Sequence, residues 1–158
     1  MAPRSVIVAA LLLAPSSVWA ADLPKQGTDS YTTTYVTVSR TQMKAGDRTI
    51  TTSEFVGITR NDNGGPMFSD MGARCLGMSE LVGKDSVGQG TCAETDNDGD
   101  EIYSTFQFKG SGGTHTFVGG TGKYAGLSGT ADFTAQSVKS PDGRGMVIVR
   151  HQATWQRP

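Results

Sequence analysis

The chain has 158 residues, of which 36% are hydrophobic and 18% charged, and its formal net charge is −1. This balance excludes the strongly basic surface of a nucleic-acid-binding protein. We therefore expect no nucleic-acid partner. No segment has the roughly 20 consecutive apolar residues of a membrane-spanning helix, so we also expect no membrane span.

The first twenty residues have the pattern of a secretory signal peptide. Arg4 precedes the apolar run 6–14, and Val18-Trp19-Ala20 places small residues where a signal peptidase reads them. We therefore expect an exported protein, located in the periplasm or outside the cell. Residues 21–29 are expected to form a flexible leader, and residues 30–158 a single domain, since this length normally builds one core.

From residue 30 onward, strand-like stretches rich in Val and Thr alternate with turn signals that contain Gly, Pro and Asp. The pattern contains no amphipathic helix of ten residues. It predicts an all-β domain, either a sandwich or a closed barrel, with eight strands at 31–40, 48–60, 72–82, 86–95, 101–109, 114–118, 127–138 and 145–156.

The two cysteines, Cys75 and Cys92, are expected to form a disulfide because an exported chain folds in an oxidising compartment. Free buried thiols and a bridge between two chains are the alternatives. Directly paired residues of an antiparallel hairpin have numbers with a constant sum, so pairing these cysteines centres the turn on Gly83-Lys84. Glycine suits the first position of a two-residue hairpin turn. The pattern therefore predicts a disulfide across two adjacent strands.

Three carboxylates alternate at Asp96, Asp98 and Asp100, the spacing with which calcium loops bring oxygen ligands onto one ion. Position six of such a loop is Glu101 here instead of glycine, and position twelve is Gln107 instead of glutamate. The sequence therefore favours a hairpin turn with solvated acids over a calcium site. We expect neither a metal nor a cofactor.

Four ionisable side chains alternate in phase with apolar residues of their own strand, which makes them candidates for catalysis or for polar groups inside the domain. A carboxylate enclosed in this way would have a raised pKa, and a histidine beside it could exchange its proton. Alternatively, a register shift of one residue turns such a side chain toward solvent or the rim. The candidates are Glu54, Glu80, His115 and His151.

The segment 113–133 resembles the glycine signature of the allene oxide cyclase-like and dirigent-like barrels. Segments 75–80 and 92–100 look like small exported bacterial members of that superfamily. The residues that carry the signature are Gly119, Gly120, Gly122, Lys123, Tyr124 and Gly126.

The resemblance implies an eight-stranded antiparallel up-and-down β-barrel with a mostly apolar cavity, which decides between barrel and sandwich. It also implies a homo-oligomer, a dimer or a trimer. Plant relatives use such cavities to steer the cyclisation of a fatty-acid epoxide or the coupling of phenolic radicals. Their catalytic residues lie outside the glycine signature, so activity does not follow from the fold.

The leading functional hypothesis is an exported barrel that binds a small apolar molecule, because an eight-stranded barrel can hold one small ligand. The alternative is a cyclase or isomerase without a cofactor, in which Glu54 or Glu80 is the base and His115 or His151 its proton partner. A third hypothesis is a structural or interaction domain whose barrel is filled by side chains.

Overall fold

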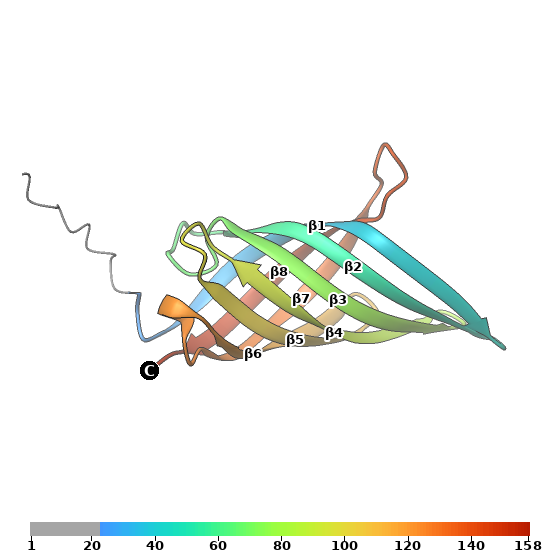
Figure 1. The fold of residues 1–158 in the computed structure, drawn as a ribbon. Helices are drawn as coiled ribbons and strands as arrows, with labels where there is room; N and C mark the ends of the chain where they lie inside the picture. Colours follow the sequence, from blue (N-terminus) through green and yellow to red (C-terminus); the bar gives the residue numbers. More distant parts are fainter. Residues whose placement is uncertain (1–22) are drawn as a thin grey trace, which may run out of the picture.

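The computed structural model describes residues 23–158, in which eight antiparallel strands form a closed barrel. Each strand pairs with its neighbours in sequence, and the first closes against the last (Figure 1). The expected up-and-down barrel is confirmed. Its elements are β1 (Gln26–Ala45), β2 (Arg48–Asn61), β3 (Met71–Val82), β4 (Asp85–Thr95), β5 (Glu101–Lys109), β6 (Gly112–Gly120), the 3-10 turn η1 (Gly122–Tyr124), β7 (Ser128–Val138) and β8 (Met146–Gln156).

The start of β1 differs from the expected leader. Residues 26–29 pair with the end of β8, and the Asp29 carboxylate accepts a hydrogen bond of 2.7 Å from Nε1 of Trp155. A partner so distant in sequence leaves no local signal at residues 26–29. The expected signal peptide, residues 1–20, lies outside the described residues, and none of the helical structure that is described could cross a membrane.

The β3–β4 hairpin has the predicted register and the predicted disulfide. Cys75 pairs directly with Cys92, with a Cα–Cα distance of 4.1 Å and an S–S bond of 2.03 Å. The two strands meet at Gly83-Lys84, where Gly83 has a φ of +60° that few other residues tolerate. Both cysteines are buried inside the barrel, so the disulfide also fixes which residues of β3 and β4 face inward.

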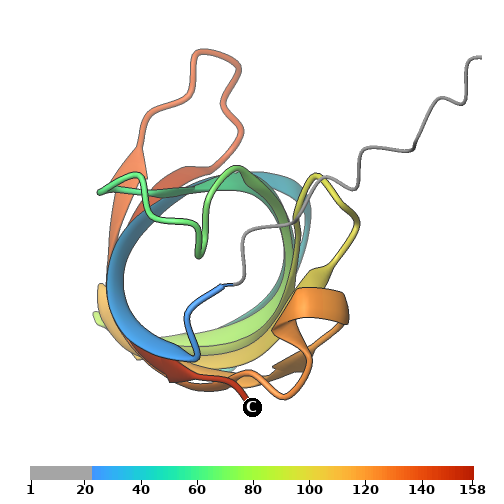
Figure 2. The ribbon, with the colours of Figure 1, turned by 90° about the vertical axis from the view of Figure 1, so that its left-hand side faces the viewer.

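One end of the barrel is closed by the loop between β2 and β3, which reaches into the ring of strands (Figure 2). The ring of Phe68 stacks on Tyr31 at 4.3 Å and on Phe117 at 5.3 Å, and Phe68 is fully buried. Asn61 holds the loop in place by donating to Asp29 and to the carbonyl of Met67. We call residues 62–70 the plug, and the end that they fill the closed end.

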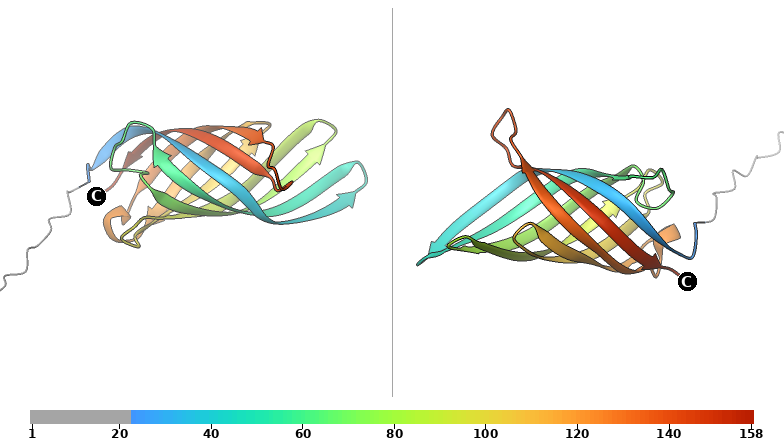
Figure 3. Two further views of the ribbon diagram at one scale, coloured as in Figure 1. Left: turned by 90° about the horizontal axis from the view of Figure 1, so that it is seen from above. Right: turned by 180° about the vertical axis from the view of Figure 1, so that it is seen from behind.

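At the opposite end, the β1–β2 and β3–β4 hairpins project furthest from the barrel body (Figure 3). Beside β4, the interior of the barrel is filled by aromatic side chains of β5, because the facing residues of β4 are glycines. Gly88 and Gly90 face inward on β4, and a Cβ atom on either would lie 2.3 to 2.4 Å from the rings of Phe108 and Phe106. The two rings therefore lie against the backbone of β4, and the centre of this open end stays unfilled.

Candidate functional site

A cavity of about 300 Å³ enters the barrel from its open end. Its walls are mostly aromatic and aliphatic, and the Cys75–Cys92 disulfide lies in the wall. This size and composition are those of a small-molecule site. The lining residues are Tyr35, Phe55, Cys75, Cys92, Phe106, Phe108, Gly110, His115, Phe133, Ala135, Ser137, Val147 and Val149.

Two polar side chains mark the inner part of this cavity. The hydroxyl of Tyr35 lies 3.4 Å from Sγ of Cys75, and burial raises the tyrosine's pKa well above its ordinary value. Nδ1 of His115 lies 3.1 Å from Oγ of Ser104, and burial lowers the histidine's pKa to about 4. Both side chains are therefore neutral at pH 7 and could hydrogen-bond a ligand without a charge.

Beyond Tyr35, toward the closed end, the barrel encloses a carboxyl group. Glu94 lies on β4 two residues after Cys92, is 4% exposed, and has burial as the main cause of a pKa raised to about 7. Its Oε2 atom has no hydrogen-bond partner among the described residues. Glu94 therefore exchanges a proton near neutral pH, which an ordinary glutamate does not do.

Hydroxyl groups connect this carboxyl to the cavity. Thr33 and Thr59 face each other on paired strands, with 2.8 Å between their Oγ1 atoms. Thr59 lies near Glu94 and Thr33 near Tyr35, and each hydroxyl lowers the pKa of its neighbour. Glu94, Thr59, Thr33 and Tyr35 thus form a row of neighbouring polar groups, which we call the hydroxyl relay. It leads from the enclosed carboxyl to the cavity wall.

His151 lies beside this relay, stacked on Tyr31 with 4.1 Å between ring centroids. Its Nδ1 donates to the carbonyl of Tyr31 at 3.3 Å, so its Nε2 carries a lone pair, and that atom has no partner among the described residues. Burial, with a contribution from His115, lowers the pKa of His151 to about 3. The two predicted histidines therefore meet inside the barrel, with their rings 5.3 Å apart.

The two predicted glutamates do not face the interior. Glu54 pairs with Arg74 at 2.7 Å and Glu80 with Arg48 at 2.7 Å, both on the outer face. The apolar residues in phase with Glu54 are exposed too, 44% for Val56 and 58% for Ile58.

The outward orientation of Val56 and Ile58 on β2 has a steric cause. A Cβ atom on Gly57, which faces inward, would lie 2.8 Å from the ring of Tyr35. The tyrosine occupies the space that a larger side chain at position 57 would need, so Gly57 points inward and its larger neighbours Val56 and Ile58 outward, while Phe55 faces inward further along β2. Alternation of hydrophobicity therefore predicts the wrong inner face for this strand.

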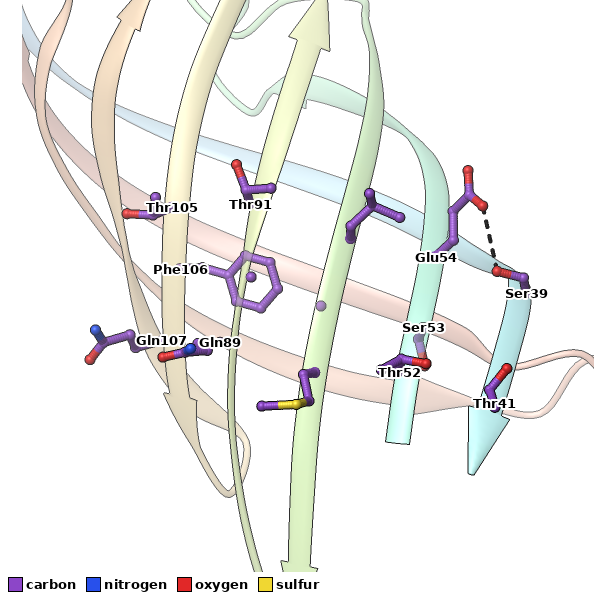
Figure 4. A pocket seen from close by; sticks show the side chains of 14 residues that line it. Ser39, Thr41, Thr52, Ser53, Glu54, Gln89, Thr91, Thr105, Phe106 and Gln107 are labelled. Carbon is purple, nitrogen blue, oxygen red and sulfur yellow. Dashed lines mark hydrogen bonds between the residues drawn. The ribbon is translucent and has the colours of Figure 1, made fainter. Parts of the chain in front are cut away.

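Glu54 lies in a separate hollow of about 680 Å³ on the outer face of β1–β5. Figure 4 shows its hydroxyl and amide side chains and the hydrogen bond of 3.4 Å from Ser39 to Glu54. Gly77 and Gly90 have no side chains, so the ring of Phe106 behind them reaches the floor of this hollow. Phe106 therefore separates the outer hollow from the inner cavity.

The acidic turn and the glycine signature bind to each other at the closed end. Nζ of Lys123 lies 2.6 Å from Asp96 and 2.5 Å from Asp98. The backbone N–H of Lys123 donates to Asp100 at 3.1 Å, and any side chain on Gly122 would collide with that carboxylate. The lysine ammonium thus occupies the space between the carboxylates considered for calcium, and the described residues contain no cluster suited to a metal ion. We call these contacts the clasp.

Glu94, Tyr35 and the threonines of the relay were not among the candidates from the sequence. A signal for Glu94 does exist in the register of the hairpin. If Cys75 and Cys92 both face inward, strand alternation turns Glu94 inward as well. For the threonines no local signal exists, because Thr is frequent on both faces of this sheet.

Comparison with solved structures identifies the fold. The barrel is similar to the pterocarpan synthase dirigent protein GePTS1, with a TM-score of 0.52 and 13% identity over 84% of this chain and 87% of that chain. The pterocarpan synthase dirigent protein PsPTS1 gives a TM-score of 0.46 and 14% identity, over 85% of this chain and 97% of the other. No family model and no curated protein matches the sequence. The chain therefore has a dirigent-like barrel.

Proposed function

We propose that this dirigent-like barrel is an exported protein that binds one small apolar molecule in the cavity at its open end. The observation that carries the proposal is the cavity of about 300 Å³, walled by five aromatic rings and by the aliphatic side chains of β7 and β8. Burying an apolar ligand there removes apolar surface from water on both sides of the contact. The disulfide supports export, because disulfides persist in oxidising compartments.

The cavity also argues against the hypothesis of a fully filled barrel. Side chains fill only the closed half, where the plug residues Met67 and Phe68 pack against Tyr31 and Trp155. The open half has aromatic walls without a side chain at the centre. Tyr35 and His115 supply neutral hydrogen-bonding groups, which suit a ligand with a hydroxyl or carbonyl oxygen.

The test is a fluorescence titration with N-phenyl-1-naphthylamine, an uncharged aromatic probe that brightens in apolar sites. We expect saturable binding to the wild-type chain. Ala135→Trp fills the cavity from β7 and should abolish binding, whereas Thr134→Trp, on the outer face of the same strand, should leave it unchanged. Absence of binding to the wild type, or equal binding by both variants, contradicts the proposal.

A second candidate function, a cyclase or isomerase, is favoured by the hydroxyl relay. A carboxyl with a pKa of about 7 can give or take a proton at neutral pH, and the relay brings that proton toward Tyr35 at the cavity wall. GePTS1 is a synthase on the same fold, although a shared fold does not transfer its activity.

Proton exchange on a bound ketone tests this second function without knowledge of the substrate. 2-Tetralone in D₂O exchanges its α-protons slowly by itself, and NMR follows the exchange. Catalysis predicts faster exchange that is lost in Glu94→Gln and Tyr35→Phe and kept in Glu54→Gln. Exchange at the background rate with the wild-type chain rejects the enzyme hypothesis in this form.

A further inference from the structure

We propose that the molecule bound in the cavity is an anionic amphiphile, an apolar or aromatic body with one carboxylate or sulfonate group, and that Arg40 and Lys44 bind the charged group. This inference rests on the proposed binding function and adds the chemical class of the ligand. Both residues lie on β1 where the β1–β2 hairpin continues beyond the cavity.

The register places both basic side chains on the inner face of the hairpin. A bulge between Thr37 and Ser39 shifts the β1–β2 pairing, so that Arg40 pairs with Ser53 and Gln42 with Thr51. Gln42 donates to the hydroxyl of Thr51 at 3.1 Å. Thr51 shares its face with Phe55, a cavity residue, and alternation puts Arg40 and Lys44 on the face of Gln42.

Arg40 and Lys44 have no described acidic partner at the entrance of the cavity, which we call the mouth. The described ion pairs include neither Arg40 nor Lys44. The other inward positions of β1–β4 beyond the cavity are held by Gln, Thr, Ser, Gly and Leu, without a carboxylate. The glutamates of this region, Glu54 and Glu80, are on the outer face and already paired with arginines, and the aspartates Asp47 and Asp85 lie in and beside the hairpin turns, without a described ion pair to Arg40 or Lys44. Anion-binding capacity therefore remains free at the mouth.

Only a short stretch of strand separates the cavity from Arg40 and Lys44, which we call the cationic lip. Arg40 pairs with Ser53, which lies two residues from the cavity residue Phe55, a rise of about 7 Å along a strand. Across the mouth, the ring of Phe106 lies against Gly77 and Gly90. A ligand with its apolar part in the cavity can thus place a charged end within reach of the Arg40 guanidinium, whose planar fork matches a carboxylate.

The distribution of charge over the barrel also favours an anion at the open end. The four connections at the open end contain or adjoin six cations, Lys44, Arg48, Lys84, Lys109, Lys139 and Arg144, against three acids, Asp47, Asp85 and Asp142. The connection between β4 and β5 at the closed end instead holds Asp96, Asp98 and Asp100. Such an asymmetry attracts an anion toward the mouth and raises its association rate at low salt.

Two fluorescent probes of nearly the same shape separate this inference from the binding function. 8-Anilinonaphthalene-1-sulfonate is N-phenyl-1-naphthylamine with one added sulfonate. We expect Arg40→Gln/Lys44→Gln to weaken binding of the sulfonate probe roughly tenfold and to leave the neutral probe unchanged. The control Arg60→Gln/Arg150→Gln removes two cations from the outer face of β2 and β8, away from the open-end connections, and should affect neither probe.

Three results would contradict the inference. If neither probe binds the wild type, the proposed function fails and this inference with it. If the neutral probe binds but the Arg40/Lys44 variant holds the sulfonate probe as tightly as the wild type, only the inference fails. Binding of the sulfonate probe that survives Ala135→Trp places it on a charged surface outside the cavity and also overturns the inference.

Discussion

Glu94 shows how burial alone changes the chemistry of a side chain. It lies between a disulfide wall and a tyrosine-rich core, with one carboxyl oxygen left without a partner among the described residues. No cation of the described residues favours its ionised form, and its pKa rises to about 7. A carboxyl of this kind reduces stability once it is ionised, so its retention inside the barrel is consistent with a functional role.

The pH dependence of stability tests the state of Glu94. Between its unfolded pKa of 4.5 and its folded pKa of about 7, the folded chain keeps a proton that the unfolded chain has lost. Wild-type stability therefore falls as pH rises through this window, by roughly 3 kcal/mol from this group, and the loss persists above it.

Glu94→Gln carries no such ionisation, so its free energy of unfolding relative to the wild type should increase between pH 4.5 and pH 7 and then level off. Urea unfolding at pH 4.5, 6 and 8 measures this difference, with the outer-face variant Glu54→Gln as control. A difference that stays constant with pH contradicts the assignment of a raised pKa to Glu94.

At the scale of elements, the disulfide and the clasp each join segments that are separated in sequence. The disulfide joins β3 to β4 across 17 positions of sequence. Replacing both cysteines, as Cys75→Ser/Cys92→Ser, should lower the free energy of unfolding by about 3 kcal/mol, because the unfolded chain regains the freedom that the cross-link removed. Urea unfolding of this variant and of the reduced wild type should agree, and a loss below about 1 kcal/mol in both would refute this account.

The clasp predicts a smaller effect of a different kind. Lys123→Met leaves the carboxylate of Asp96, which is 7% exposed, without its cation, and should cost about 1 kcal/mol. Arg144→Met breaks the ion pair with Asp142 in the exposed β7–β8 loop and serves as the matched control. Thermal unfolding should rank Lys123→Met below Arg144→Met, and the reverse order contradicts a structural role for the clasp.

The residue ranges of the strands were largely predictable from the sequence. Which face of a strand points into the barrel was not always predictable. On β8, the residues from Val147 to Trp155 that alternate in phase with His151 do face inward. On β2, Tyr35 from the neighbouring strand takes up the interior, and the hydrophobic alternation points outward. Side chains of neighbouring strands compete for the same interior space. The pattern within one strand therefore does not show which of them fills it.

At the scale of the whole molecule, the barrel is divided into a filled half and a hollow half. The plug that fills the closed half comes from a loop whose sequence, Asn63-Gly64-Gly65-Pro66, predicts only a turn. The apolar pair Met67-Phe68 after it was the available signal, since large apolar residues in a polar loop need a place to be buried. The relay and the cationic lip depend on long-range register and could not be read from local sequence.

The outer face of β2 and β3 carries exposed apolar side chains, namely Val56, Ile58, Leu76 and Met78. A patch of this kind is typical of an interaction surface. We expect a second copy of the chain to cover it, in line with the homo-oligomer that the family resemblance implies. Light scattering should give the mass of a dimer or trimer for the wild type and of a monomer for Ile58→Lys, with Val118→Lys as control. A monomeric wild type contradicts this expectation.

The central claim is that the open half of the barrel is a ligand cavity, and an NMR titration of the ¹⁵N-labelled chain with N-phenyl-1-naphthylamine tests it most directly. The account predicts saturable shifts in amides that line the cavity, such as those of Tyr35, His115 and Ala135, while those of the plug and of Thr41 and Thr52 in the outer hollow stay in place. Shifts confined to the outer face of β2 and β3, or none at all, would contradict it.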